Sequence, residues 1–227
     1  NKKNVVLIES GSLFSLNSCT PYSTVEMQQK YKNGGLTPTF NSPRITYVEG
    51  ECVGGGSEIN SGFYHRTPED IIKRWEKDYS IKNFNSEDLI ENYKQIEREI
   101  SVSKLPDWDD PAEASVKLKI GADKLGWENM EVPRWFKFRE GEDGVKQSMT
   151  ETYIKKYIKK GGELITNLKV VRLKKRKTKW ILFCKNMRSG ELSNIECNFV
   201  FLCGGSINTP FLLRNSGIKK NIGNTLQ

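Results

Sequence analysis

The sequence predicts an α/β fold, or α+β when all elements are counted, with a parallel sheet, a β-meander and separate helices. Two apolar runs, Val5–Ile8 and Phe199–Cys203, each lead into glycine. Such runs are typical of strands that are buried on both faces of a parallel sheet. Residues that cap helix starts precede several stretches of helical periodicity. After Glu163 the apolar period falls to two, which favours short antiparallel strands.

The first strand is expected at Val5–Ile8, where the apolar run ends in Glu9 and is followed by Gly11. Residues 13–48 come next and are rich in Ser, Thr, Asn, Pro and Gly. They predict a long irregular loop, a type of connection that is usually functional or covers a site as a lid.

Helices are then expected from their start signals. Thr67 and Pro68 open one helix, and Ser86 lies near the start of a second. The remaining starts are Asp110–Glu113, Ser148–Glu151 and Thr209–Pro210, and the last helix stops at Ser216–Gly217. The segments Pro106–Asp110 and Trp127–Gly144 are expected to be irregular crossings between two domains.

The β-meander is expected between Glu163 and Cys197, with a turn at Arg188–Gly190 before the last strand. Its expected strands are Leu164–Leu168, Val170–Lys174, Trp180–Lys185 and Leu192–Cys197.

Composition indicates a soluble globular domain. Charged residues make up 28% and hydrophobic residues 36%, and no apolar run approaches the roughly 20 residues that span a bilayer. The net charge of +8 and the basic run Lys169–Lys177 raise nucleic-acid binding as an alternative. Because neither interleaved aromatic residues nor a recognisable binding module accompanies this run, we expect a solvated strand edge and turn, with only weak, nonspecific retention of nucleic acid.

The cysteines form an odd set without CxxC spacing, so we expect reduced, mostly buried thiols rather than disulfides or a zinc site. They are Cys19, Cys52, Cys184, Cys197 and Cys203. The sequence does not identify the compartment, and the cytoplasm is the expected location in the absence of other signals. His65 is the only histidine, so no Ser/His/Asp, Cys/His or metal constellation can be assembled, and we expect His65 to be structural.

The most informative segment is the glycine-rich turn before the helix at Thr67. Gly54, Gly55 and Gly56 lack Cβ atoms, so they can adopt positive φ and let a ligand approach the backbone. Successive N–H groups in such a turn suit phosphate oxygens. The alternative is a turn that serves only the backbone geometry.

The segment Val53–Asn60, with Tyr64 at the aromatic position, resembles the first signature of the glucose-methanol-choline (GMC) oxidoreductases, FAD enzymes that oxidise alcohols. Two departures exist. Glu51 stands where a basic residue is usual, and Pro68 comes one position late.

A second match follows in the same order as in that family. Gly205–Ile218 resembles the second GMC signature, with Lys219 in place of its terminal glycine. Phe199–Gly205 is similar to the strand that returns to the FAD domain, and Ile222–Gln227 resembles a G-x-N-L-Q element with altered spacing. Gly34–Leu36, ahead of the first signature, is similar to the long-chain alcohol oxidase and sugar-alcohol dehydrogenase branches.

The resemblance implies FAD as the cofactor and a set of residues around it. Glu9, at the end of the second strand of a dinucleotide fold, would hydrogen-bond a ribose hydroxyl, and the alternative is a solvated acid at a strand end. The other implied contacts are Gly54, Gly55, Gly56 and Ser57 at the pyrophosphate, Asn60, Ser61 and Gly62 beside the isoalloxazine ring, Val170 at the adenine, and Gly204 and Gly205 after the returning strand.

The resemblance also implies a domain organisation. Residues 1–82 and 148–227 would form two parts of an FAD-binding domain, and residues 83–147 part of a substrate domain. The chain would be a central fragment, with the first strand and its G-x-G-x-x-G loop before residue 1 and the catalytic histidines beyond Gln227. We therefore expect marginal stability, no turnover and little or no FAD affinity from the chain alone, because Val5–Ile8 would be an unpaired apolar edge.

The function implied is FAD-dependent oxidation of alcohol CH–OH groups, with hydride passing from the substrate carbon to flavin N5. The alternative is a non-catalytic remnant of such an enzyme that binds a nucleotide or a partner protein. The resemblance identifies neither the alcohol nor the electron acceptor.

Overall fold

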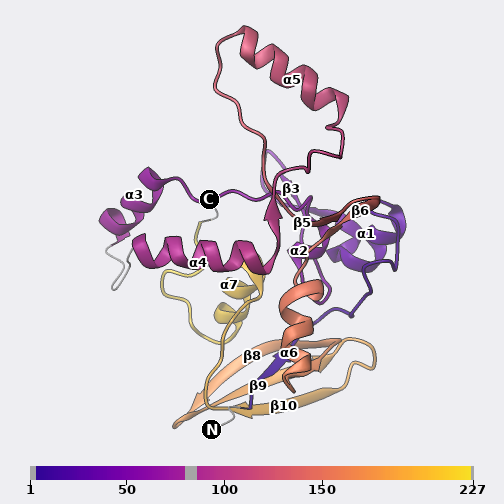
Figure 1. Ribbon diagram of the computed structural model, residues 1–227. Coiled ribbons are helices and arrows are strands. Elements are labelled where there is room, and N and C mark those ends of the chain that lie inside the picture. The colour runs from indigo at the N-terminus through magenta and orange to yellow at the C-terminus, as the bar shows by residue number, and fades with distance from the viewer. Residues whose placement is uncertain (1–3, 80–85, 226–227) are drawn as a thin grey trace. The chain divides into compact units, whose positions relative to one another are not determined.

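The computed structural model describes residues 4–79 and 86–225 (Figure 1). The chain divides into two compact units. Unit 1 comprises Asn1–Gly56 and Tyr157–Gln227, and unit 2 comprises Ser57–Lys156. The expected domain limits, 1–82, 83–147 and 148–227, stay a prediction. The first of these boundaries lies outside the described residues, as does the end of the G-x-N-L-Q-like element at 226–227.

Unit 1 contains a short parallel pair of strands. β1 (Val6–Ile8) pairs in parallel with β7 (Glu163–Ile165). The expected parallel strand is thus confirmed, but the expectation that both of its faces are covered is wrong, because Val5 is 57% exposed. Ile8 packs against the core of unit 1, so only one face of this strand is covered.

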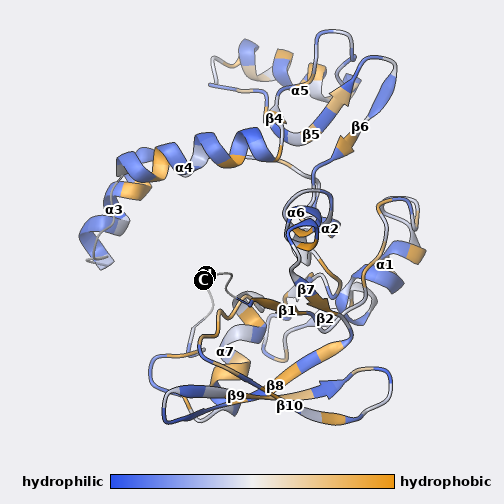
Figure 2. Cartoon of the chain, turned by 60° about the horizontal axis from the view of Figure 1, so that its bottom comes forward, coloured by the Kyte–Doolittle hydropathy of each residue, from blue (hydrophilic) through white to orange (hydrophobic). Residues whose placement is uncertain are grey.

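The expected β-meander is confirmed in unit 1 for three of the four expected strands, whereas the first, Leu164–Leu168, is divided between β7 and the start of the next strand. β8 (Leu168–Arg176), β9 (Lys179–Asn186) and β10 (Leu192–Cys197) form an antiparallel sheet in the order β10-β9-β8. A bulge interrupts the β8–β9 register between Val170 and Arg172. Apolar residues colour parts of β1 and β8 in Figure 2. The buried core cluster of this unit consists of Leu168, Leu173, Leu182 and Cys184.

The segment Phe199–Cys203 was expected to be a buried strand, and this is wrong for the described structure. Phe199 and Phe201 are 83% and 90% exposed, and no described strand pairs with the segment. Val200 and Leu202 pack against the core cluster. The segment therefore buries alternate side chains on one face, but it forms no strand-to-strand hydrogen bonds with a described strand.

Helix α7 (Gly205–Asn215) follows directly and starts earlier than the expected Thr209–Pro210. Pro210 lies inside the helix, where it removes one backbone hydrogen bond without stopping the helix. The expected end is confirmed, since Ser216 is the C-cap and Gly217 has a φ of +86°. The Ser216 hydroxyl accepts a 2.8 Å hydrogen bond from the Leu173 amide, which ties α7 to β8.

Residues 13–48 are more regular than expected. They contain α1 (Thr24–Lys30), the 3-10 turn Lys32–Gly35, and the short antiparallel pair β2 (Thr37–Pro38) and β3 (Thr46–Tyr47). Ser23 caps α1, because its hydroxyl accepts a hydrogen bond from the Glu26 amide at 3.2 Å. A capping signal was therefore present in a segment whose composition indicated a loop.

Unit 2 begins inside α2 (Gly56–Ile59) and combines helices with a small sheet. The sheet is antiparallel in the order β4-β5-β6. After α2, the elements of unit 2 are α3 (Glu69–Tyr79), α4 (Ser86–Glu99), β4 (Val102–Ser103), α5 (Glu113–Lys124), β5 (Arg134–Arg139), β6 (Glu142–Lys146) and the π-helical turn Thr150–Ile154. This turn continues into α6 (Lys155–Lys159), within which unit 2 ends.

The expectation of irregular structure at Trp127–Gly144 is wrong, because β5 and most of β6 lie within it. The two strands form a hairpin whose turn includes Gly141 with a φ of +77°. Trp135 of β5 is 7% exposed and supplies one of the few buried apolar side chains of unit 2. The helix expected from Asp110–Glu113 is confirmed as α5, but no side chain caps its start.

All five cysteines are free thiols, as expected. The expectation that most of them are buried is wrong, because only Cys52 and Cys184 are buried and Cys203 is exposed. Cys203 ends the segment that lacks a strand partner, which explains its exposure.

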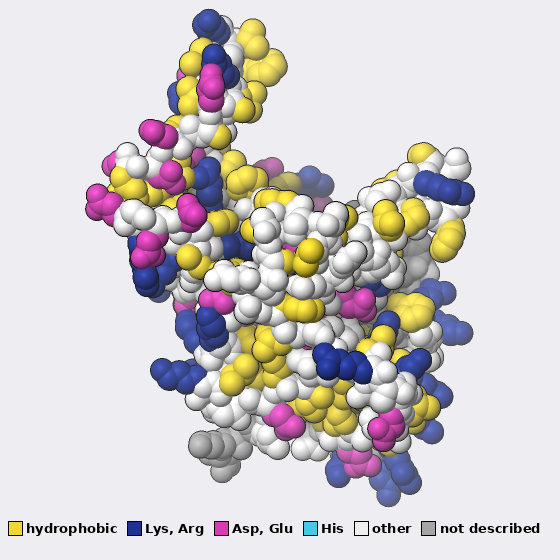
Figure 3. Space-filling model, turned by 90° about the vertical axis from the view of Figure 1, so that its right-hand side faces the viewer, with side chains coloured by type: hydrophobic (Ala, Val, Ile, Leu, Met, Phe, Trp, Pro, Cys, Tyr) yellow, Lys and Arg dark blue, Asp and Glu magenta, His cyan; other side chains and the backbone are white. Residues whose placement is uncertain are grey.

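The distribution of charge bears on nucleic-acid binding, and the length of the helices bears on membrane spanning. The basic run Lys169–Lys177 occupies β8, an edge strand of the meander, and the turn that follows. On the face shown in Figure 3, Lys and Arg side chains are interspersed with Asp and Glu rather than gathered in one patch. No helix within the described residues has the length and apolar character needed to cross a bilayer.

Candidate functional site

The glycine turn of unit 1 starts from a contact between two segments. Ser12 and Cys52 form an isolated parallel bridge, and the Val53 amide donates to the Ser12 carbonyl at 3.0 Å. The chain then turns through Gly54 and Gly55, whose φ angles are +93° and +53°. These left-handed conformations require glycine, so the sequence-based interpretation of the turn is correct at the level of the backbone.

The turn leaves space where a ligand could approach. A Cβ atom placed on Gly55 or on Gly56 would meet nothing within 4 Å. By contrast, a Cβ on Gly50 would lie 2.5 Å from the Gly55 carbonyl carbon. The inner side of the turn is therefore closed by the protein's own backbone, and the outer side is open.

Glu9 lies at the carboxyl end of β1, next to this turn. Its Oε1 accepts hydrogen bonds from the Gly11 amide at 2.8 Å and from the Ser10 hydroxyl at 3.1 Å. The Glu9 carbonyl accepts from the Leu168 amide at 2.9 Å, where β8 begins. A backbone hydrogen bond thus joins Glu9, the residue predicted to bind the ribose, to β8, the strand that carries Val170.

Gly11 connects these segments, and sequence reasoning missed its role. Its carbonyl accepts from the Asn167 amide at 3.0 Å. A Cβ on Gly11 would lie only 2.1 Å from the Glu51 carbonyl oxygen. The end of β1, the start of β8 and the first signature therefore meet at a position where only glycine fits.

The two signatures are also linked within unit 1 by side chains. The Lys32 ammonium donates to Glu49 Oε2 at 2.7 Å and to Asn208 Oδ1 at 3.0 Å, and the Asn208 amide donates to Glu49 Oε1 at 3.0 Å. Glu49 lies four residues before Val53, where the first signature begins, and Asn208 belongs to the second, in α7. Lys32 and Glu49 were not predicted as site residues, and their partners lie too far along the chain for a local pattern to reveal them.

The predicted residues after the second apolar segment have glycine-compatible geometry. Gly205 has a φ of +81° and open space at its Cβ position. A Cβ on Gly204 would lie 3.3 Å from the Thr209 hydroxyl, a tight contact that a small shift could relieve.

The remaining predicted residues, beginning with Ser57, lie in unit 2 and are held by side chains. The Ser57 hydroxyl accepts from the Met149 amide at 3.0 Å. Glu58 is 4% exposed, and its Oε1 accepts from the Thr150 hydroxyl at 2.8 Å and from the Thr150 amide at 3.3 Å. The π-helical turn that starts at Thr150 therefore clamps this half of the first signature.

Lys146, at the end of β6, holds the backbone of the same segment. Its ammonium donates to the carbonyl oxygens of Glu58 at 2.7 Å and Asn60 at 2.8 Å. The Asn60 side chain accepts from the Gly62 amide at 3.0 Å, across Ser61. Gly62 has a φ of +71°. Sequence reasoning found the signature residues but neither Lys146 nor Thr150.

His65 was expected to be structural, and this stays a prediction. Its side chain is exposed, and Nδ1 lies 2.7 Å from the Arg66 carbonyl oxygen. No group of His, Cys, Asp and Glu side chains suited to a metal ion occurs within residues 4–79 and 86–225.

The predicted residues of unit 1 fit a dinucleotide with an anionic centre. The turn is open on its outer side, where a ligand could approach, although the Gly55 amide already donates to the Cys52 carbonyl at 2.9 Å. An acid ends the neighbouring parallel strand. Unit 2 supplies a second set, Ser57 and Asn60–Gly62, which continues from the turn along the chain.

Comparison with known proteins identifies the chain's relatives. Residues 27–227 match the family model described as GMC oxidoreductase. An uncharacterised GMC-type oxidoreductase of Sinorhizobium fredii is 31% identical over 98% of this chain and 46% of its own length. Two long-chain-alcohol oxidases of Arabidopsis thaliana, FAO3 and FAO4A, are 23% and 25% identical, each over 98% of this chain and 32% of its own length. The chain thus spans about a third to a half of the length of these relatives.

Proposed function

The chain belongs to the GMC oxidoreductase family, and on this premise we propose that the protein oxidises the CH–OH group of an alcohol. The N-terminal domain of this family binds FAD, so membership supports FAD as the cofactor. When bound, FAD accepts a hydride from the alcohol carbon at its N5 atom.

In this proposal, the residues of unit 1 hold the nucleotide part of the cofactor. Glu9 binds a ribose hydroxyl, the backbone of Gly54–Gly56 receives the pyrophosphate, and Val170 lies at the adenine, with Gly204 and Gly205 nearby. The observation that carries the proposal is the junction at Gly11, where the end of β1, the start of β8 and the first signature are joined by backbone contacts.

The residues of unit 2 would serve the reacting end. Ser57 continues the pyrophosphate contact, and Asn60, Ser61 and Gly62 line the isoalloxazine ring. Support comes from the way in which Lys146 and Thr150 fix this segment, since a catalytic segment must be held in place to orient a hydride donor.

We propose an aliphatic alcohol as the substrate class, because two relatives are named long-chain-alcohol oxidases. The test is anaerobic mixing of the flavin-loaded protein, expressed from the complete reading frame that contains this chain, with linear primary alcohols and with sugar alcohols. Bleaching of the flavin absorbance by the linear alcohols supports the proposal, and bleaching by the sugar alcohols alone contradicts the substrate class.

A matched pair of glycine variants tests the cofactor assignment. Gly55→Ala and Gly141→Ala both place a methyl group at a left-handed position with open space around it, so they carry a similar backbone cost. Only Gly55 lies in the proposed pyrophosphate turn. In the protein expressed from the complete reading frame, we expect Gly55→Ala to weaken FAD binding about tenfold, measured by flavin fluorescence, and Gly141→Ala to retain it. Equal FAD affinity in both variants would contradict the assignment.

The alternative of a non-catalytic remnant has its own test. An in-frame G-x-G-x-x-G loop upstream and a histidine-bearing segment downstream in the encoding DNA would support the enzyme. Stop codons on both sides would support a remnant that binds a nucleotide or a partner.

A further inference from the structure

Unit 2 contains a cavity that the proposed FAD site does not use. Its volume is about 370 Å³, within the range of small-molecule pockets. Its apolar walls are Tyr64, Val102, Met130 and Pro133. The Tyr64 amide donates to the Pro133 carbonyl at 2.8 Å, so two of the walls are fixed to each other by the backbone.

Two of the charged groups that border the cavity, Arg66 and Glu97, neutralise each other. Arg66 donates two hydrogen bonds to the carboxylate of Glu97, at 2.5 and 2.6 Å. This bidentate pair leaves neither charge in need of an ionised ligand. Lys104 and His65 also border the cavity, and both are exposed to solvent.

Tyr64 presents a neutral wall. Burial, followed by the nearby Glu97 carboxylate, raises the pKa of the Tyr64 phenol to about 12. Its hydroxyl is buried and lies near Glu97, but without the geometry of a hydrogen bond to any described residue. The ring, not the hydroxyl, is therefore what the cavity offers to a ligand.

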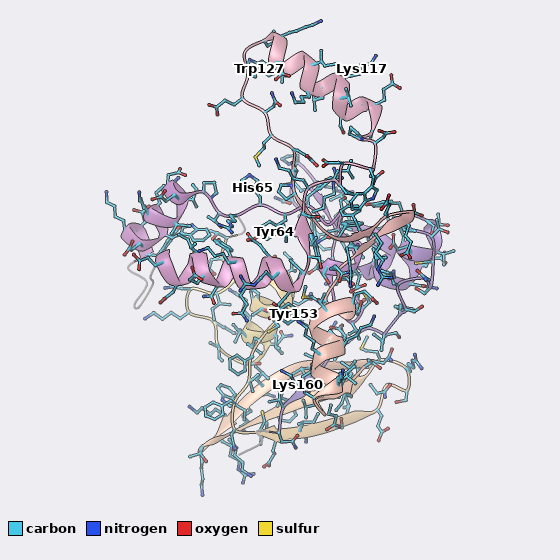
Figure 4. The ribbon with its side chains drawn as sticks, viewed as in Figure 1. Tyr64, His65, Lys117, Trp127, Tyr153 and Lys160 are labelled. Carbon is cyan, nitrogen blue, oxygen red and sulfur yellow. The ribbon has the colours of Figure 1, made fainter. Side chains whose placement is uncertain are left out.

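The cavity follows the first signature along the chain. Tyr64 and His65 are neighbours on the segment that runs from Gly62 toward α3 (Figure 4). A ligand in this cavity would therefore lie within unit 2, beside the segment Asn60–Gly62 that is proposed to line the isoalloxazine ring.

We propose that this cavity binds the alkyl chain of a linear primary alcohol. The inference rests on the proposed function for the choice of an alcohol, and on the apolar walls and the closed Arg66–Glu97 pair for the choice of an alkyl chain. Each buried methylene contributes a roughly constant hydrophobic free energy, which corresponds to about a fourfold gain in affinity. The affinity should then level off once the cavity is full.

A histidine at the cavity gives a direct readout of binding. His65 borders the cavity, and its two ring C–H signals in the NMR spectrum are assigned by their loss in His65→Gln. We expect the linear alcohols from butanol to decanol to shift these signals saturably, with the dissociation constant falling about fourfold per methylene until it levels off. Absence of a shift, or affinity that is independent of chain length, would overturn the proposal.

An alkyl carboxylate series tests the head group. Because the Arg66–Glu97 pair is closed, we expect octanoate to bind no more tightly than octanol. Tighter binding of octanoate that is lost in Lys104→Met would identify a fatty-acid site and overturn the alcohol assignment.

Two methionine variants test the location. Met130→Gln places an amide in the cavity wall, and we expect about a tenfold loss of decanol affinity. Met187→Gln changes another exposed methionine that does not line the cavity, and we expect no loss. A cooperative urea unfolding transition like that of the wild type shows that Met130→Gln is folded, and equal losses in both variants would overturn the location.

These measurements need no flavin and no turnover. Absence of alcohol binding, with flavin bleaching by linear alcohols intact, would overturn this inference and leave the proposed function standing. Binding without any bleaching in the loaded protein would overturn the proposed function and leave the cavity assignment standing.

Discussion

On the N-terminal side of Gly56 the first signature is held by backbone contacts, whereas on the C-terminal side it is held by side chains. Gly50 and Gly11 bring main-chain atoms into contact in unit 1, with no room for a Cβ. In unit 2, Thr150 and Lys146 hold Glu58 and the residues after it. The backbone half depends on missing side-chain atoms, so it should tolerate substitution least. The side-chain half depends on particular polar groups, so a substitution that keeps the group should be tolerated.

The largest expected effect is at Gly11. In Gly11→Ala the new methyl carbon would meet the Glu51 carbonyl oxygen at 2.1 Å, and backbone atoms cannot move aside as a side chain can. We expect a loss of about 3 kcal/mol in the free energy of unfolding, measured by urea denaturation. Gly121→Ala is the control, because open space surrounds its Cβ position in α5, and it should be neutral or stabilising by up to about 1 kcal/mol. Wild-type stability of Gly11→Ala would contradict the view that close backbone contacts hold the N-terminal half of the first signature.

The side-chain half is tested at Thr150. Thr150→Val removes the hydroxyl that donates to the buried Glu58 carboxylate, at an expected cost of about 2 kcal/mol in urea unfolding. Thr150→Ser keeps the hydroxyl and should recover most of this loss. Wild-type stability of Thr150→Val, with a loss in Thr150→Ser, would show that packing of the Thr150 methyl, and not the hydrogen bond, holds this half.

The link between the two signatures is tested by a double-mutant cycle. Lys32→Met and Asn208→Ala each break one side of the Lys32–Glu49–Asn208 network. Since the three groups share partners, we expect a coupling of about 1 kcal/mol between the two substitutions. Additive effects on the free energy of unfolding would show that the signatures are not coupled through these side chains.

The smallest effect is expected from the exposed pair in unit 2. Hydrogen bonds from Arg66 hold the pKa of the Glu97 carboxyl below its usual value. The stability from this pair is therefore present above the pKa of an unfolded-state carboxyl and is lost as the pH falls through the lower, folded-state pKa. Because 43% of the Arg66 side chain is exposed, we expect less than about 1 kcal/mol.

The measurement is urea unfolding of the wild type and of Glu97→Gln between about pH 5 and about pH 3. The stability difference between them should shrink toward acid pH and also with added salt. A difference that grows on acidification would contradict the sign of this effect.

Local patterns predicted the elements whose signals lie within a few residues. The strand at Val5–Ile8, the meander and the stop at Ser216–Gly217 were correct because periodicity and capping are local properties. The same patterns failed at Phe199–Cys203, since an apolar run specifies a buried face but not the existence of a pairing partner.

The candidate site shows the same limit. The glycine turn was identified because positive φ needs glycine, which the sequence displays directly. Lys32, Glu49 and Lys146 were missed because their contacts depend on the tertiary fold. Gly11 was noted only as a strand end, and its close approach to Glu51 becomes visible only when both segments are placed. The family resemblance implied roles for the signature residues, and the structure shows which other residues hold the signature in position.

Helix α5 has a practical consequence. None of its residues is buried, and Lys117, Lys119 and Lys124 are exposed along it, with Trp127 just beyond its end (Figure 4). A helix with so little packing unfolds locally at a low free-energy cost. Limited trypsin digestion should therefore cut first in α5 and give two fragments, one that ends after β4 and one that begins before β5. The same stretch is then the natural place to insert an affinity tag or a fluorescent label without disturbing either half of the signature.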